Sequence, residues 1–288
     1  MKRSLATIVL CMLICVFANA NEKDRSATGL LRPGWYVQTD LYVQYNSLAA
    51  LGVFEASYNL PLREKMNMVW SHVEGGPHLT VNPSATSIGV HGEWMPVALF
   101  KLEVMYDYLI FHGAFGALTE FETVDAPHDE DDMSRSSLGK HGTAHRMVIS
   151  PVLQALYHGV LLRNENQLML YGANTDAPYW FNWDIESLSE PNDFVFGERI
   201  SIMYDILVHH ESRMLFAGPS YSLTWQPSTH FRRQRVGIDI YAEPFDTQKK
   251  VVPHFLLITG FNLEETYRKH EFVVIVNAGI NIDPRRTH

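Results

Sequence analysis

Charged side chains recur at every second position of one apolar segment, and they are the first candidates for chemistry in this chain. In residues 97–112, all even positions from 98 to 110 are apolar, while Lys101, Glu103 and Asp107 stand at odd positions. A period of two places alternate side chains on opposite faces of a β-strand. We therefore expect these three charges to share one face of a strand, opposite a face that is wholly apolar.

The same alternation in other segments supplies further polar faces, which would line the interior if the strands closed into a barrel with an apolar outside. Charges of both signs could then form a salt-bridged network that fills the lumen. They could also line a narrow aqueous path, in which an acidic excess favours cations. A barrel of about twelve strands lies between filled barrels of about eight and open ones of roughly 16 to 18, so both alternatives stay open. The candidate lumen-lining residues are Asp40, Glu55, His91, Glu93, Lys101, Glu103, Asp107, Arg146, His158, Arg199, Asp205, Arg235 and Asp239.

Hydrolysis of lipids is the enzymatic alternative, and it needs a nucleophile beside a histidine near the rim of the barrel. No spacing in the chain reproduces the His-x-Ser-Asn-Gly pattern of outer-membrane phospholipases. A serine and a histidine are expected by chance in a chain of this length, so we assign no catalytic residue. The residues considered for this role are His112, His141, His145, His158, Ser134, Ser136 and Ser137.

Consecutive carboxylates in the segment 113–143 offer oxygen ligands of the kind that Ca²⁺ and Mg²⁺ prefer. An EF-hand loop alternates its ligands and has a glycine at its turn position, and this run has neither feature. An acidic run is typical of a solvated loop. The run is therefore only a weak candidate for a metal site, and we assign no metal and no cofactor. Its residues are Asp129, Glu130, Asp131 and Asp132.

The overall charge is acidic, with 23 lysines and arginines against 32 aspartates and glutamates. This balance argues against nucleic acid as a partner, because binding phosphates needs a basic face. Arg232, Arg233 and Arg235 form a local basic cluster, which could contact lipopolysaccharide phosphates through bidentate hydrogen bonds. Solvated arginines near an interface are the alternative interpretation of this cluster.

The N-terminus has the pattern of an export signal. Lys2 and Arg3 precede the apolar segment 5–17, and Ala18-Asn19-Ala20 follows it, which predicts a signal peptide cleaved after Ala20. The apolar segment is shorter than the roughly 20 residues that a membrane-spanning helix needs. Both cysteines of the chain lie in this peptide, so we expect no disulfide, no cysteine-ligated metal and no cysteine nucleophile in the exported protein.

Twelve segments alternate with a period of two, and glycines within them can mark bends or bulges. Short connections are expected on one side, near 61–65, 95–97, 163–166, 209–212 and 246–249. Longer ones are expected on the other side, at 113–143, 178–193, 226–233 and 262–269, with two short connections there near Asn46 and Gly75. The clear segments are 35–45, 88–94, 97–112, 145–158, 194–208, 213–225, 235–242 and 272–282, and the weaker ones are 48–60, 66–74, 167–179 and 251–261.

With these strands and connections, the chain resembles a bacterial outer-membrane β-barrel protein. Short turns on one side, long loops on the other and an even strand count are typical of that class. So are aromatic residues near strand ends, which would form interfacial girdles. A soluble secreted sandwich or lipocalin-like barrel is the alternative, and the polar end 283–288 departs from the aromatic ending of many outer-membrane barrels. The aromatic residues concerned are Trp35, Tyr58, Trp94, Phe111, Trp180, Trp183, Trp225 and Tyr267.

The resemblance implies an all-β fold, an antiparallel up-and-down transmembrane β-barrel of about twelve strands, within a range of roughly 10–14. It also implies a location in the outer membrane of a Gram-negative bacterium, contact with outer-membrane lipid and lipopolysaccharide, and insertion by the barrel assembly machinery. We expect a signal peptide at 1–20, a short periplasmic segment at 21–33, the barrel at 34–283 with a long loop at 113–143, and a polar tail at 284–288.

The leading functional hypothesis is a channel or passive transporter for small solutes. A structural or interaction barrel with a salt-bridged, filled lumen and partner-binding outer loops is the alternative. A lipid hydrolase ranks behind both, because no catalytic motif supports it.

Overall fold

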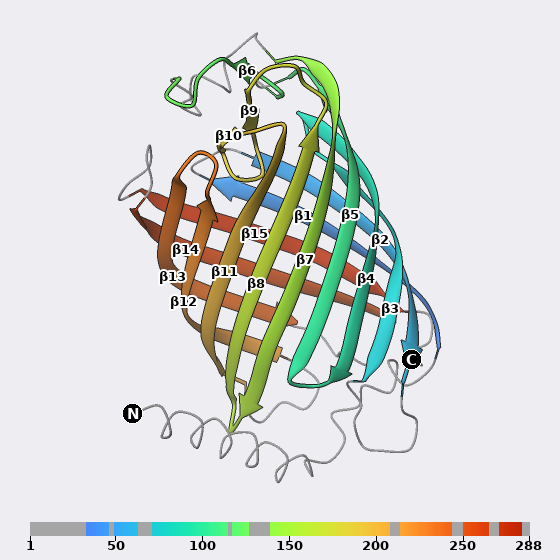
Figure 1. Ribbon diagram of the computed structural model, residues 1–288. Helices are drawn as coiled ribbons and strands as arrows, with labels where there is room; N and C mark the ends of the chain where they lie inside the picture. Colours follow the sequence, from blue (N-terminus) through green and yellow to red (C-terminus); the bar gives the residue numbers. More distant parts are fainter. Residues whose placement is uncertain are drawn as a thin grey trace.

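A computed structural model describes residues 33–45, 49–62, 71–114, 117–126, 139–207, 214–243, 250–264 and 271–283. The predicted signal peptide, the acidic run 129–132 and the polar tail lie outside these ranges. Within them, twelve antiparallel strands form a closed barrel (Figure 1), which confirms the expected fold class and strand count. No helix in this part of the chain is long and apolar enough to cross a membrane.

Each barrel strand pairs with its neighbours in chain order, and the last strand closes the barrel on the first. The strands are β1 (Gly34–Tyr45), β2 (Ala49–Pro61), β3 (His72–Val81), β4 (Ala85–Val97), β5 (Phe100–His112), β7 (His141–Tyr157), β8 (Val160–Ala173), β11 (Asn192–Asp205), β12 (Met214–Gln226), β13 (Phe231–Glu243), β14 (Val251–Glu264) and β15 (Phe272–Ile282). Three short strands, β6 (Glu120–Phe121), β9 (Tyr179–Asn182) and β10 (Ser187–Ser189), form a separate sheet over one mouth of the barrel (Figure 1).

Alternation along the strands separates an apolar outside from a polar inside. On β1, Leu41 points outward and is 54% exposed, whereas its neighbour Asp40 points inward and is 6% exposed. Most outward positions of the other strands are also occupied by large apolar side chains, among them Ile88 and Val90. A soluble lipocalin-like barrel has the opposite arrangement, so the outer face is suited to lipid.

Three of the predicted connections are misplaced. Residues 95–97 were predicted to turn, but they lie inside β4, and the turn is formed by Ala98 and Leu99. Arg163 to Asn166 were predicted to turn, but they lie inside β8, and the turn is formed by His158 and Gly159. Both residues of that turn have positive φ, 47° and 77°, as a tight type I′ hairpin requires. Residues 163–166 are polar, as turn residues commonly are, which explains the wrong prediction. In the structure each of them pairs with β11.

The predicted connection near Gly75 is also misplaced, because Gly75 lies inside β3. The chain turns at residues 82–84 instead. There the side-chain oxygen of Asn82 accepts hydrogen bonds from the backbone of Ser84 and Ala85, at 2.9 and 2.6 Å. An asparagine that bonds to the backbone two or three residues ahead is a common turn former.

Two long connections, 113–140 and 174–191, meet at the end of the barrel that we call the cap end, and the opposite end is the base. We call their described residues the cap. Four cap residues pack against inward side chains of the strands, and this apolar cluster was not predicted. It comprises Ala117, Leu118, Trp180 and Ile185 of the cap and Ala85, Leu109, Phe111, Ala144, Tyr171 and Val195 of the barrel wall. Phe111 and Trp180 therefore belong to this cluster, although they were expected in the interfacial girdles.

Inward-facing glycines let polar side chains meet across an intervening strand. Neighbouring strands are about 4.8 Å apart, so side chains that stand directly in line two strands apart can meet where the position between them has no side chain. His78 on β3, Gly89 on β4 and Asp107 on β5 are in register, and His78 Nε2 lies 2.5 Å from Asp107 Oδ1. A Cβ on Gly89 would lie 2.5 Å from His78 Cε1, so the contact depends on glycine.

The same arrangement recurs at two other places. Asp40 on β1 and His254 on β14 are joined across Gly279 of β15, with 2.7 Å between Oδ1 and Nε2. Ser57 on β2 and His91 on β4 are joined across Gly76 of β3, also at 2.7 Å. These glycines leave room for contacts between side chains of the flanking strands. This role differs from the bends and bulges that were expected from the sequence.

Replacing Gly279 by alanine should destabilise the barrel. The new Cβ would overlap Asp40 Oδ1 and would lie 2.5 Å from His254 Cε1. We expect the free energy of unfolding to fall by about 1–3 kcal/mol, the usual cost of overpacking. Urea-dependent unfolding of the detergent-folded protein, followed by tryptophan fluorescence, measures this difference.

Gly92→Ala is the matched control, because the nearest atom to its new Cβ is 3.8 Å away. Alanine at an unstrained position leaves stability unchanged or raises it slightly. Equal losses in the two variants would show that glycine acts through the backbone and not through the space above it.

Candidate functional site

The charged lumen and the cap above it form the candidate functional site. Most of the predicted lumen residues stand on inward faces of the strands, and the structure joins several of them directly. The joined groups are Glu93 with Lys101 and Glu103, Asp107 with Arg146, and Arg199 with Asp239.

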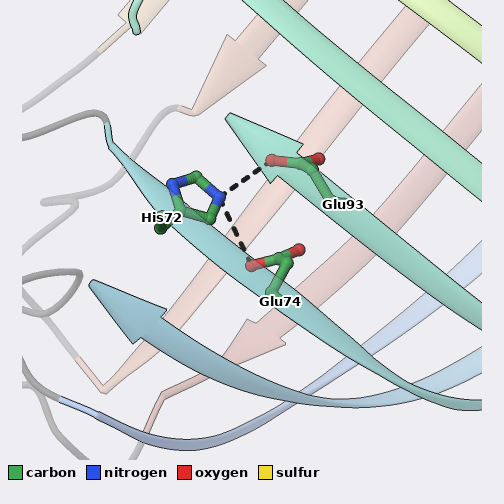
Figure 2. A group of neighbouring side chains, drawn as sticks. All are labelled: His72, Glu74 and Glu93. Atoms are coloured by element: carbon green, nitrogen blue, oxygen red, sulfur yellow. Dashed lines mark hydrogen bonds and ion pairs between the residues drawn. The ribbon is translucent and has the colours of Figure 1, made fainter. Parts of the chain in front are cut away.

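A carboxylate cluster lies near the base. Figure 2 shows His72 and Glu74 on β3 and Glu93 on β4 pointing toward one another. His72 Nε2 lies 2.8 Å from Glu93 Oε1 and 3.7 Å from Glu74 Oε2. Lys101 Nζ is 3.0 Å from Glu93 Oε2 and also pairs with Glu103. We call these five residues the base cluster.

The base cluster continues into the neighbouring strands. The Tyr36 hydroxyl donates to Glu74 Oε1 at 2.6 Å, and the Asn59 amide donates to Glu74 Oε2 at 3.3 Å. Further round the wall, Arg163 pairs with Glu165 at 2.9 Å. Every ionised carboxylate named here has at least one donor, as buried charges require.

Three residues of the base cluster could hold a divalent cation. One imidazole nitrogen of His72 and one carboxylate oxygen each of Glu74 and Glu93 lie within 4.8 Å of one another. A histidine with carboxylates is a donor set of zinc sites. Lys101, Tyr36 and Asn59 already bond to the same carboxylates, whereas Nδ1 of His72 and Oδ1 of Asn59 have no hydrogen-bond partner among the described residues. The candidate predicted from the sequence, 129–132, lies outside the described residues.

Asp107 is the centre of a second group, in the half of the lumen nearer the cap. Its side chain is fully buried, and its Oδ2 accepts two hydrogen bonds from Arg146, from Nε at 2.9 Å and from Nη2 at 2.7 Å. Ser87 donates to the same carboxylate at 3.0 Å, and His78 bonds to it across Gly89. The sequence identified Asp107 and Arg146, whereas His78 was missed because its strand alternates only weakly.

Asp239 is the centre of a third group. Arg199 donates to it from Nε at 3.1 Å and from Nη2 at 2.5 Å. Ser201 and Ser220 each donate to it at 2.9 Å. Asp239 is 3% exposed, so these four hydrogen bonds replace the water that its charge would otherwise bind.

The remaining predicted lumen residues have separate environments. Asp40 is bonded to His254 and to Gln38, and His91 is bonded to Ser57. Arg235 donates to Asn262 at 3.1 Å, and Asp205 accepts from the backbone of Leu207 at 3.0 Å. Glu55 is in register with His78 and Gln38 on the same inward row. His158 stands in the β7–β8 turn at the base with an exposed side chain, not on the lumen face of a strand.

Two ion pairs and one hydrogen bond tie the cap to three separate parts of the wall. Arg146 of β7 binds Asp184 of the cap at 2.8 Å as well as Asp107 of the wall. Arg233 of β13 binds Glu186 at 3.0 Å, and Gln44 of β1 donates to the same carboxylate at 3.0 Å. The barrel order separates β7, β13 and β1, so residues 184–186 reach across the mouth.

The two connections of the cap are also joined to each other. Glu120 accepts from Lys140 and, at 2.7 Å, from the Thr175 hydroxyl. The Lys140 hydrogen bond and then the Thr175 hydrogen bond hold the pKa of Glu120 below its usual value. This contact therefore keeps a charged carboxylate between the two connections at neutral pH.

One serine and one histidine are adjacent in the lumen, but they do not form a triad. Ser57 Oγ lies 2.7 Å from His91 Nε2, while His91 Nδ1 has no hydrogen-bond partner and so no acid orients the ring. Ser57 is fully buried. At the cap end, His112 bonds to Thr86, and His145 bonds to Tyr106 on the outward face. The serines 134, 136 and 137 lie outside the described residues.

The predicted basic cluster does not form a single patch. Alternation sends Arg232 outward, where it lies 3.4 Å from Glu264. Arg233 and Arg235 point inward to Glu186 and Asn262. A basic surface made of all three arginines is therefore excluded, because adjacent strand residues face opposite sides.

Comparison with known proteins places the chain by its fold. No protein-family model matches the sequence, and no curated protein matches it. Among solved structures, the β domain of the Bordetella autotransporter BrkA has a TM-score of 0.50 at 9% identity, covering 87% of this chain and 99% of that one. The KdgM porin has a TM-score of 0.38 at 7% identity, covering 86% and 98%. LpxR from Salmonella typhimurium has a TM-score of 0.40 at 10% identity, covering 86% and 99%.

At these identities the likeness concerns the fold alone. Together with the closed twelve-stranded barrel and its apolar outer face, the likeness to the BrkA β domain shows that this chain has the architecture of an outer-membrane β-barrel protein.

Proposed function

We propose that the chain is a resident of the Gram-negative outer membrane and acts as a structural or interaction barrel with a filled lumen. The observation that carries this proposal is the cap, which is tied across one mouth by Asp184 and Glu186. Short turns face the periplasm and long loops face outward in such barrels, so the cap faces the outside. Insertion by the barrel assembly machinery and contact with lipopolysaccharide follow from this location.

The apolar cluster beneath the ties supports a closed outer mouth. Leu118, Trp180 and Ile185 of the cap are at most 2% exposed. Burial of a large apolar side chain contributes about 1.5–3 kcal/mol, so displacing the cap costs several such contributions. A solute could enter from outside only after these side chains had left the wall.

The interior supports the same conclusion. Asp107 and Asp239 are buried and fully engaged by Arg146 and Arg199, and their groups extend over several adjacent strands. Charges held in this way fill space and fix the wall. In a filled barrel the capped outer surface is the surface that is available to a partner.

A gated channel for small cationic solutes is the second candidate, and one observation favours it. In the base cluster and its continuation, acidic residues outnumber lysine and arginine. The acidic residues are Glu74, Glu93, Glu103 and Glu165, and the basic ones are Lys101 and Arg163. An acidic excess attracts cations. In this candidate the cap is a gate, and the base cluster sets selectivity once the gate has moved.

Removing the ties of the cap should loosen it without disturbing the wall. Asp184→Asn with Glu186→Gln leaves the Arg146–Asp107 pair intact. A hydrogen bond to a charged group contributes about 1.5–3 kcal/mol, so cleavage of segment 174–191 by a protease should accelerate about tenfold. Glu120→Gln is the control, because Glu120 joins the two connections to each other, and its substitution leaves the ties between the cap and the wall intact. Equal cleavage of the double variant and the wild type would contradict the role given to these ion pairs.

Conductance in planar bilayers separates the two candidates. For the filled barrel we expect no steady current from the wild type and brief openings from the Asp184→Asn, Glu186→Gln variant. A steady wild-type current that prefers K⁺ over Cl⁻ would support the channel instead. In that case Glu103→Gln should lower the preference for K⁺, because Glu103 belongs to the base cluster.

A further inference from the structure

Three polar residues stand on the outward face of the barrel, within the apolar band. They are Asn164 and Asn166 on β8 and Glu198 on β11, and we call them the outward polar patch. Glu198 is in register with Asn166, and Ile200 with Asn164. β8 and β11 are adjacent in the barrel wall (Figure 1).

Apolar side chains continue the outward rows on both sides of the patch. On β8 the outward row passes from Leu162 to Leu168, which are 41% and 36% exposed. On β11, the outward residues Phe194 and Ile202 lie on either side of Glu198 along the strand. The patch is therefore inside the apolar band and not at one of its borders.

The three side chains bond to one another in a row. Asn166 Nδ2 donates to Asn164 Oδ1 at 2.6 Å, and Asn164 Nδ2 donates to Glu198 Oε1 at 3.2 Å. Each amide has two N–H donors and one carbonyl acceptor, and a carboxylate accepts up to about four hydrogen bonds. The row therefore uses only part of the hydrogen-bonding capacity of the patch.

Lipid tails cannot supply the missing partners. Polar and ionisable side chains at this depth are costly and mark functional sites, with partners supplied by protein. A lipid phosphate lies at the border of the bilayer and carries the same sign of charge as Glu198. Protein donors and acceptors are the groups that fit.

We propose that the outward polar patch is the centre of an interface between two copies of this chain in the membrane. A two-fold axis places the same patch on both sides, so the surface must complement itself. It does so, because the amides of one copy can donate to Glu198 of the other. Interhelical hydrogen bonds stabilise membrane proteins by the same exchange of lipid for protein partners. The inference rests on the membrane location proposed above and is independent of whether the lumen conducts.

Single cysteines test the position of the interface. Both native cysteines, Cys11 and Cys15, precede the barrel, so an introduced cysteine is the only thiol in the barrel itself. In lipid vesicles, Leu168→Cys and Ile200→Cys beside the patch should give cross-linked dimers with a short bis-maleimide. Leu41→Cys on β1 and Ile280→Cys on β15 are exposed controls elsewhere on the wall and should remain monomeric. Equal cross-linking at all four positions would show random collision and overturn the proposal.

Substitution of the patch tests its chemistry. In the Ile200→Cys background, leucine at 164, 166 and 198 removes every donor and acceptor, and the cross-linked fraction should fall about fivefold or more. Glu198→Gln keeps the hydrogen bonds and should retain the dimer. Leucine suits a lipid-facing position, so these variants should still insert, which co-flotation with vesicles checks separately. Failure to float would count against the membrane location, whereas floating leucine variants that cross-link like the parent would overturn the interface.

Discussion

The ion pair between Arg146 and Asp107 connects parts of this molecule that lie far apart in the sequence. Asp107 is fully buried, so its charge is tolerable only with Arg146, His78 and Ser87 around it. The second half of the guanidinium binds Asp184 of the cap. Arg146 therefore neutralises Asp107 of the wall and also holds the cap in position. The register that aligns Gly89 between His78 and Asp107 leaves room for this arrangement.

The lumen is graded along its axis. Near the cap, charges are paired and the apolar cluster excludes water, whereas carboxylates prevail in the base cluster. This gradient makes the two ends chemically different, because carboxylates prevail at the base, whereas Trp180 and Ile185 pack against the wall at the cap end. A filled barrel and a gated channel share this design, and the strength of the cap ties distinguishes them.

Period-two alternation predicted most of the strands and identified Asp107, Arg146, Arg199 and Asp239 as inward residues. It could not identify their partners, because contacts across a glycine depend on the register of three strands, which no single segment contains. His72, His78 and His254 were missed for this reason and because their segments alternate weakly. The cap was missed because Asp184 and Glu186 acquire their roles only from Arg146 and Arg233, which are remote in sequence.

The misplaced turn at 163–166 has a physical origin that bears on function. Alternation in a membrane barrel predicts apolar residues at outward positions, and Asn164 and Asn166 violate that rule, so a polar run inside β8 resembles a connection. Pairing with β11 shows that these residues form a strand and not a turn, but the two asparagines still occupy outward positions. Hydrogen bonds to Glu198 satisfy part of their hydrogen-bonding capacity, and lipid can satisfy none of the rest. β8 breaks the alternation that a lipid-facing strand requires and still pairs with β11. The proposed second copy would supply the hydrogen-bond partners that its outward polar groups lack.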